Sequence, residues 1–260
     1  MEATASEWAN LVVRWAHVFA GILWIGSTWY FTWLDRTLHA SGGGGVLMVH
    51  SGGFYKVDKL AETRADPSKI HWFRYEALVT WLTGLVLLAI VYWPSADMMS
   101  ETLGHGAAIG LGIGLLAVGW VVYDLLWSTP IPQLAGAAVS WLLLVAIAFG
   151  LTRAFNGRAA FIHLGAMMGT IMVLNVWVRI LPAQRKLVAA LAEGRPGDPR
   201  LAAQAKMRSM HNTFIILPVL MTMISNHFPT ATYGAQAPWA VFGVLVLAGW
   251  GGAKLVRELR

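Results

Sequence analysis

Residues 209–228 read SMHNTFIILPVLMTMISNHF. The apolar residues in this stretch approach the number that a helix needs to cross a bilayer, which is about 20. A His-Asn pair stands near its start, an Asn-His pair near its end, and Pro218 between them. Polar and ionisable side chains are costly in lipid and mark functional sites where they occur. The stretch therefore predicts a membrane helix whose two ends are candidates for functional sites.

The composition of the whole chain is typical of a membrane protein. Its 260 residues are 57% hydrophobic and 12% charged, whereas soluble domains contain about 25% charged residues. The chain has no cysteine, which excludes disulfides, thiolate metal sites, iron–sulfur clusters and a covalently bound c-type haem. The N-terminal MEATASEW lacks the basic region of a signal peptide, so the first apolar stretch is expected to be a retained helix.

Seven apolar runs predict an all-α fold, a polytopic transmembrane helix bundle of about seven spans. We expect the spans at about 11–33, 75–93, 106–127, 133–151, 159–181, 212–228 and 238–256. Together they form one integral membrane domain, residues 1–260, whose first partner is the lipid bilayer.

Lysine and arginine gather in alternate loops. The loop 34–74, the loop 182–211 and the C-terminal end contain Arg36, Lys56, Lys59, Arg64, Lys69, Arg74, Arg185, Lys186, Arg195, Arg200, Lys206, Arg208, Lys254, Arg257 and Arg260. The loops on the other side contain almost none beyond Arg153 and Arg158. The positive-inside rule then places the N-terminus outside and the C-terminus in the cytoplasm. The same rule explains the net charge of +6, so no nucleic-acid partner is expected.

Two Asp-Pro pairs predict helix starts in the basic loops. At Asp66-Pro67 an N-cap residue is followed by proline at the first helical position. The second helix is therefore expected to begin near Pro67 and to carry His71 and Trp72. Asp198-Pro199 repeats the signal ahead of the sixth span.

Three glycines of the third span, Gly106, Gly110 and Gly114, are spaced four apart. This spacing is typical of closely packed membrane helices. A dinucleotide-binding fingerprint would need a preceding strand, which this apolar run lacks.

Two histidines are expected at matching depth in the outer half of the bundle. His17 shares a helix face with Trp24, and His163 shares one with Met167. Each lies roughly 9 Å below the outer surface at about 1.5 Å per residue. Paired imidazoles are axial ligands of a membrane haem b, so His17 and His163 are candidate ligands of haem iron, and Trp24 is a candidate cofactor contact.

Other interpretations of the outer histidines stay open. Each of them can instead form a hydrogen bond between helices. His227 and His105 also fall near the outer side, and either can replace one member of the pair. His211 and His227 are sixteen residues apart, roughly 24 Å along a helix, so they belong to different sites or cap the helix at each interface.

Polar residues also gather at the inner ends of the spans. They are the candidate catalytic residues His71, Glu76 and His211 and the candidate substrate-binding residues Trp72, Asn175, Arg179 and Asn212. Cations, amides and an aromatic plane together suit a flat, anionic heterocycle. Arg74 and Arg179 are alternatively positive-inside anchors. Glu76 is expected to pair with an arginine or histidine, or to accept a proton.

Several blocks together resemble one protein family. They are HWFRYEALVTWLTG (71–84), FIHLGAMMGTIMVLNVWVRILPAQ (161–184) and RSMHNTFIILPVLMTMISNHF (208–228), with WAHVFAGILWIGSTWYF (15–31) and GGFYKV (52–57). They are similar to the membrane domain of bacterial membrane-bound urate oxidase (urate hydroxylase). The pattern of His17, Trp24 and Gly26 is also similar to copper-resistance D-type proteins and to a membrane protoporphyrinogen oxidase that holds haem b.

The resemblance implies a bacterial inner-membrane oxidoreductase that oxidises urate, or a related purine, to 5-hydroxyisourate. Oxygen is not the direct acceptor, and electrons pass through the membrane haem to a cytochrome c. In the family this cytochrome is a domain fused after a further helix. Here the chain ends at Arg260 without a cysteine, so either a separate cytochrome c or a quinone is the expected acceptor, or the chain is a paralogue with another role.

Two other functions fit the same residues. The first is a non-enzymatic haem b membrane protein, or an accessory subunit of a larger electron-transfer complex. The second is a small-molecule transporter, which the lack of a visible internal repeat makes less favoured.

Overall fold

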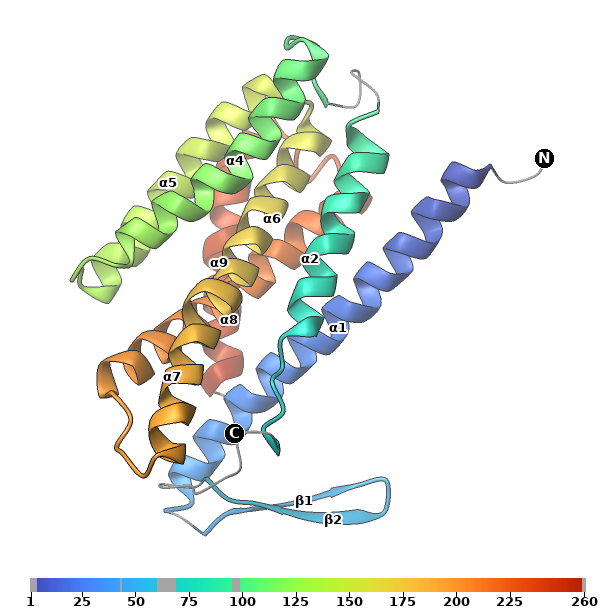
Figure 1. The fold of residues 1–260 in the computed structure, drawn as a ribbon. Helices are drawn as coiled ribbons and strands as arrows, with labels where there is room; N and C mark the ends of the chain where they lie inside the picture. Colours follow the sequence, from blue (N-terminus) through green and yellow to red (C-terminus); the bar gives the residue numbers. More distant parts are fainter. Residues whose placement is uncertain (1–3, 43, 60–68, 95–98, 259–260) are drawn as a thin grey trace.

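A computed structural model of the chain describes residues 4–42, 44–59, 69–94 and 99–258. The described residues form a helical bundle with one short β-hairpin, which confirms the predicted fold class (Figure 1). The long helices are α1 (Ala5–Ala40), α2 (Tyr75–Leu87) with the π-helical turn η2 (Leu88–Tyr92), α4 (His105–Leu126), α5 (Gln133–Ala154), α6 (Gly157–Leu174) and α9 (Pro238–Glu258). After α6 come the π-helical turn η3 (Asn175–Ile180), α7 (Leu181–Ala192), α8 (Pro199–Ile224) and the 3₁₀ turn η4 (Ser225–His227).

Six helices of the described chain are long and apolar enough to cross a membrane. They are Ala5–Ala40, Tyr75–Tyr92, His105–Leu126, Gln133–Ala154, Gly157–Ala192 and Pro238–Glu258. These helices mark the chain as an integral membrane protein in contact with lipid. The seventh expected span, 212–228, lies in α8 and η4, and α8 does not meet the same criterion because its first half is polar.

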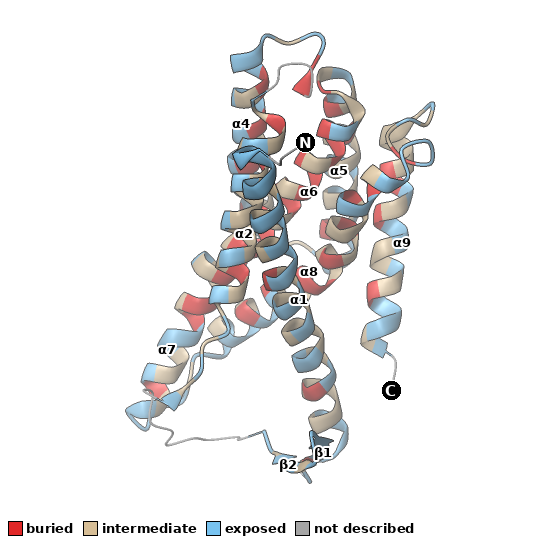
Figure 2. Ribbon diagram, turned by 90° about the vertical axis from the view of Figure 1, so that its right-hand side faces the viewer, coloured by how far each residue is buried: buried red, intermediate tan, exposed pale blue. Residues whose placement is uncertain are grey.

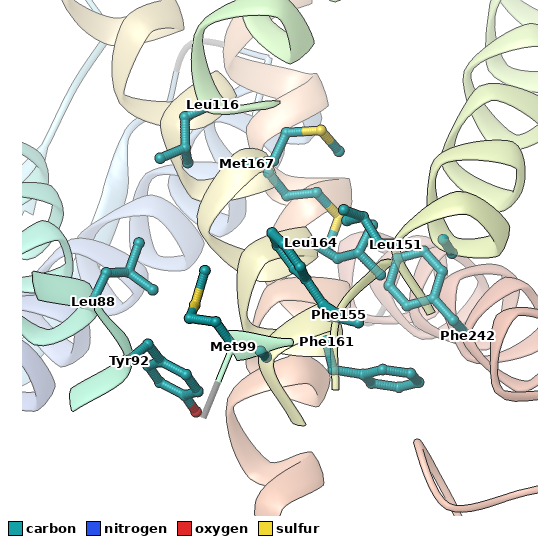
Figure 3. Packing of buried hydrophobic residues seen from close by; sticks show 14 of the residues in the cluster. Leu88, Tyr92, Met99, Leu116, Leu151, Phe155, Phe161, Leu164, Met167 and Phe242 are labelled. Carbon is teal, nitrogen blue, oxygen red and sulfur yellow. The ribbon is translucent and has the colours of Figure 1, made fainter. Parts of the chain in front are cut away.

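The helix Gly157–Ala192 forms the centre of the bundle, with α2, α4, α5 and α8 around its α6 part (Figures 1 and 2). In its apolar, membrane-spanning stretch 78% of the residues are buried, compared with 6% in that of α1. Phe161, Leu164 and Met167 of α6 are at most 1% exposed and fill the main core (Figure 3). Because α6 contacts protein on all sides, it shows no polar face, whereas α1 presents exposed apolar side chains such as Trp15 and Ile22 to lipid.

The prediction for the glycines of α4 is wrong in detail. A Cβ added at Gly106, Gly110 or Gly114 meets no atom within 4 Å, so these residues make no close helix contact. The close contacts are at Gly112 and Gly119, where an added Cβ lies 2.9 Å from His163 and 2.5 Å from Met167. Residues seven apart share a helix face, and this face packs against α6.

The two predicted helix starts have different outcomes. The N-cap Asp198 accepts a hydrogen bond from the backbone N–H of Arg200 at 2.8 Å, and α8 begins at Pro199, as predicted. Asp66 and Pro67 lie outside the described residues. The helix α2 begins at Tyr75, so His71 and Trp72 lie in a non-helical segment and not on the helix, as was expected.

The loop 34–74 contains a hairpin that was not predicted. Strands β1 (Val46–His50) and β2 (Gly53–Val57) pair antiparallel around Ser51 and Gly52, both of which have positive φ. Two such residues are typical of a tight two-residue hairpin turn.

One end of the bundle, called the basic end below, holds Lys59, Arg185, Lys206 and Arg257. The hairpin, α7, the start of α8 and the ends of α1 and α9 lie there, and the start of α1 lies at the opposite end (Figure 1). This arrangement agrees with the predicted separation of basic and non-basic loops. Which end faces the cytoplasm stays a prediction.

Candidate functional site

A polar pocket of about 870 Å³ lies at the basic end. Its walls come from α1, the segment 70–73 that precedes α2, the stretch from η3 to α7, the N-terminal half of α8 and the end of α9. Parts of the chain that are far apart in sequence therefore meet around one cavity.

Basic side chains dominate the charge of the polar pocket. Its lining includes Arg36, Lys59, Lys206 and Arg257, and among the described lining residues Asp35 is the one carboxylate. Lys59 donates to Asp35, and Lys206 Nζ lies 3.8 Å from its Oδ2. Four cations against one carboxylate leave an excess of positive charge, which favours an anionic ligand.

Hydrogen bonds hold two of these cations in the pocket wall. Arg257 donates from Nη1 to Thr213 Oγ1 at 3.0 Å. Arg36 donates to the backbone carbonyl of Arg257. These contacts tie the end of α9 to α8 and to α1, so the guanidinium groups are positioned before any ligand arrives.

Aromatic rings form a second part of the wall. Trp24, Trp72, Phe31 and Phe73 all line the pocket. The ring of Phe73 lies 5.0 Å from that of Phe31 and 4.4 Å from the imidazole of His71, edge-on in both cases. Flat rings beside fixed cations suit a planar, anionic ligand.

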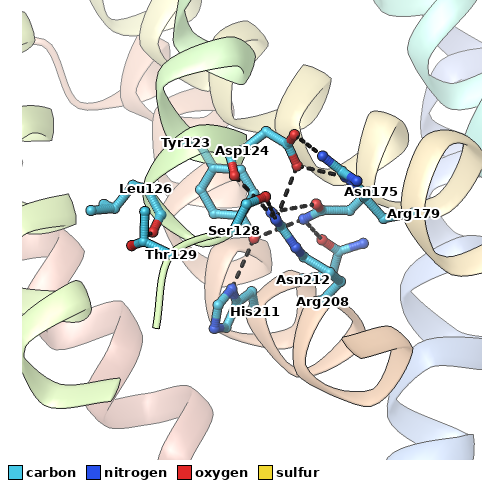
Figure 4. A network of polar contacts seen from close by, with 10 residues as sticks. All are labelled: Tyr123, Asp124, Leu126, Ser128, Thr129, Asn175, Arg179, Arg208, His211 and Asn212. Atoms are coloured by element: carbon cyan, nitrogen blue, oxygen red, sulfur yellow. Dashed lines mark hydrogen bonds and ion pairs between the residues drawn. The ribbon is translucent and has the colours of Figure 1, made fainter. Parts of the chain in front are cut away.

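A buried ion cluster lies beside the pocket and joins α4, η3 and α8 (Figure 4). Arg179 Nε donates to Asp124 Oδ1 at 2.8 Å, and Arg208 Nη2 lies 2.9 Å from the same oxygen. Arg208 is fully buried and also donates to Ser128 Oγ at 3.3 Å. Asp124 and the role of Arg208 were not predicted from the sequence, although a carboxylate inside the apolar run 106–127 indicates a functional or paired residue.

A chain of hydrogen bonds continues from this cluster. Arg208 Nη1 donates to Asn175 Oδ1 at 3.5 Å, and Asn175 Nδ2 donates to Asn212 Oδ1 and to the Tyr123 hydroxyl, each at 3.0 Å. The Tyr123 hydroxyl lies 2.8 Å from His211 Nδ1. Residues from three elements are thus held in one network, which Figure 4 shows.

The π-helical turn η3 explains the position of Asn175 and Arg179. A π-helical turn inserts an extra residue into a helix, rotates the side chains around it and occurs often at functional sites. Asn175 is fully buried at the start of this turn, and Arg179 follows within it. A regular 3.6-residue helix would direct these side chains differently.

The structure divides the predicted inner group in two. His71, Trp72 and Asn212 line the polar pocket. Asn175, Arg179 and His211 belong to the buried network, in which Asn212 also takes part. The ion pair of Arg179 with Asp124 gives it a partner inside the protein, in addition to any part in membrane orientation.

Glu76 stands apart from both groups. It is in the first turn of α2, where the helix dipole stabilises a carboxylate. In the described part of the chain it forms no ion pair and does not line the pocket. The expected pairing of Glu76 with an arginine or histidine is therefore not found among these residues.

His17 faces α2. Its Nδ1 lies 2.8 Å from the backbone carbonyl of Thr80 and 3.1 Å from Thr83 Oγ1, and a Cβ added at Gly84 would lie 3.1 Å from its ring. This is the interhelical hydrogen bond that is the alternative interpretation of His17 given above. Trp24, on the same helix, lines the polar pocket.

His163 faces α4 and is fully buried. Its Nδ1 lies 2.8 Å from the backbone carbonyl of Ala159 in its own helix. Its Nε2 has no hydrogen-bond partner among the described residues, and it packs against Gly112, where an added Cβ would lie 2.9 Å away. The backbone of α4 therefore occupies the space in front of this nitrogen.

The arrangement of these histidines does not fit a haem held between them. The helix α2 lies between α1 and α6 (Figure 1), so His17 and His163 do not face each other across one cavity. His227 is exposed in η4, beyond the end of α8. The ligation of haem by His17, His163 or His227 stays a prediction from sequence.

Comparison with known families and proteins gives one match. The family model described as urate oxidase N-terminal matches residues 3–257, nearly the whole chain. No curated protein and no solved structure matches the chain.

Proposed function

Because this chain belongs to the urate oxidase N-terminal family, we propose that it is a membrane oxidoreductase that oxidises urate, or a related purine, in the polar pocket. The observation that supports this proposal most is the pairing of four cations with flat aromatic walls in one cavity. Urate is a planar anion with carbonyl and N–H groups around its edge. The guanidinium of Arg257 matches its charge, Trp24 and Trp72 match its flat faces, and the amide of Asn212 matches its polar edge.

The proposed reaction removes two electrons from the purine. Urate and one water give 5-hydroxyisourate, two protons and two electrons. The imidazole of His71 lines the pocket and is the proposed acceptor of one of these protons. The electrons leave to a separate cytochrome c, to a quinone, or to a partner in a membrane complex. Glu76 and His211 do not line the pocket, so neither is assigned a contact with the purine.

Paired variants on α9 test the proposal. Arg257 lines the polar pocket, whereas Lys254, one turn earlier, is exposed and does not. Loss of a charge-assisted hydrogen bond costs about 1.5–3 kcal/mol, so Arg257→Gln should raise the Kd for urate at least about tenfold, and Lys254→Gln should leave it unchanged. Calorimetric titration of the purified full chain measures binding.

Turnover is measured in the same preparation under anaerobic conditions, with ferricyanide as artificial acceptor and the ultraviolet absorbance of urate as the signal. Consumption of urate by the wild type and by Lys254→Gln is the expected result. Equal urate affinity in all three proteins would remove the pocket from the proposal. Binding without any oxidation would reduce the function to a purine-binding membrane protein.

A further inference from the structure

A second cavity, called the apolar cleft below, has a volume of about 760 Å³ and lies among α4, α5, α6, α8 and α9. On α4 it extends from Gly110 to Trp127, roughly 25 Å at about 1.5 Å per residue. Its lining is almost entirely apolar and includes Leu111, Leu115, Val118, Val122, Leu143 and Ile147. The open faces of Gly110 and Gly114 form part of this wall, which explains why no helix packs on them.

One end of the apolar cleft is polar. His211 lines it together with Tyr123 and Trp127, and His211 is 8% exposed. Its Nε2 is buried and has no hydrogen-bond partner among the described residues. A buried polar atom without a partner costs about 1–3 kcal/mol of folding stability. A ligand group that forms a hydrogen bond with this nitrogen would remove that cost.

The hydrogen-bond chain determines which kind of group the nitrogen needs. Arginine only donates, so Asn175 accepts from Arg208 through Oδ1 and donates through Nδ2 to the Tyr123 hydroxyl. The hydroxyl, having accepted this bond, directs its own hydrogen to His211 Nδ1. The neutral imidazole then carries its proton on Nε2. Nε2 is therefore a donor and requires an acceptor such as a carbonyl oxygen.

The same network connects the two cavities. Asn212 lines the polar pocket, and Tyr123 and His211 line the apolar cleft. Asn175 joins them, with bonds of 3.0 Å to both Asn212 and Tyr123. Met210 lines both cavities. A reductant in the pocket and an oxidant in the cleft would thus be separated by a few side chains.

We propose that the apolar cleft binds a membrane quinone, with a ring carbonyl accepting from His211 Nε2 and the hydrocarbon tail lying along α4. This proposal rests on the proposed function for its redox role: urate, water and quinone give 5-hydroxyisourate and quinol. The two electrons and two protons lost by urate and water equal those gained by the quinone. A lipid acyl chain would fill the same walls but would leave the Nε2–H without an acceptor.

Binding is tested first without urate, so that its outcome does not depend on the proposed function. The full chain in detergent is photolabelled with an azido-ubiquinone, and the labelled peptides are identified by mass spectrometry. We expect label on the peptides of α4 and α8 that line the cleft. Gly114→Leu, whose side chain enters the cleft without meeting protein, should lower this label at least about tenfold, and His211→Phe should lower it through loss of the donor.

Gly106→Leu is the matched control, because Gly106 is equally open but does not line the cleft. It should be labelled like the wild type. Label spread evenly over lipid-facing helices such as α1, or unchanged by Gly114→Leu, would overturn the proposal and leave the cleft to an acyl chain or to a second copy of this chain.

Turnover is the second measurement. With urate as reductant, Gly114→Leu should lower the rate with decylubiquinone relative to the rate with ferricyanide at least about tenfold. An unchanged ratio would contradict the redox role of the cleft. If no urate is oxidised with either acceptor, the proposed function fails, while the photolabelling result still decides whether a quinone binds.

Discussion

The polar pocket and the apolar cleft meet at one turn of α8, where Met210 lines both, His211 lines the cleft and Asn212 lines the pocket. The pocket is surrounded by cations and aromatic rings from segments that flank the basic loops. The cleft is surrounded by aliphatic side chains and by the open face of two glycines on α4. The two cavities are similar in volume, about 870 and 760 Å³, so size does not distinguish them.

This difference gives the two faces of one polar network different surroundings. The network presents an amide to the charged side and an imidazole donor to the apolar side. The proposed occupants follow this difference: a water-soluble anion in the first cavity and a lipid-soluble acceptor in the second. The buried cluster around Asp124 belongs to neither lining, and Arg208 connects it to the network through Asn175.

The largest effect is expected when the buried ion cluster around Asp124 is broken. Asp124→Ala leaves the fully buried Arg208 without its carboxylate, and loss of one partner of a buried ion pair costs about 3–5 kcal/mol. The variant should unfold at a clearly lower temperature in detergent and lose binding at both cavities. Glu193→Ala, whose pair with Arg195 is exposed, is the control and should change stability by less than about 1 kcal/mol. Equal melting temperatures for the two variants would show that Asp124 does not stabilise the buried ion cluster.

A smaller effect is expected on the packed face of α4. Gly112→Leu places a side chain against the ring of His163, where even a Cβ lies 2.9 Å away. Overpacking of this kind costs about 1–3 kcal/mol. Gly106→Leu, on an open face, should leave the thermal midpoint unchanged. If the two leucine variants melt alike, α4 and α6 are not packed as described.

The smallest effect sharpens the comparison by changing the polar pocket alone. Trp24→Ala removes one aromatic wall of the pocket, and aromatic pairing contributes about 0.5–1.5 kcal/mol, so the Kd for urate should rise by a factor of about 2 to 13. Trp15→Ala, on the exposed face of the same helix, should not change it. Photolabelling of the cleft should be equal in both variants. A rise in Kd for Trp15→Ala as well would show that the assay reports general damage to α1.

Part of the candidate site could be predicted from residue types. Cations, amides and aromatic residues at the ends of apolar runs predicted a site near the basic loops, and His71, Trp72 and Asn212 line the pocket at the basic end. Their distribution between pocket and network could not be predicted. The π-helical turn η3 rotates Asn175 and Arg179 away from the positions that they would have in a regular helix. No local sequence pattern predicts such a turn.

The outer histidines show the same limit. Position along each helix placed His17 and His163 at equal depth, but depth does not determine which neighbour each one faces. The neighbours are α2 for His17 and α4 for His163. For the same reason the spacing of Gly106, Gly110 and Gly114 did not identify the packed face of α4.

The sequence by itself determined the membrane bundle, the separation of basic and non-basic loops and the start of α8 after its N-cap Asp198, because apolar run length, loop charge and cap chemistry are local properties. The tertiary structure alone decided which polar residues share a cavity. That choice depends on how neighbouring helices are rotated and on the π-helical turn at Asn175, and both follow from packing between segments distant in the chain.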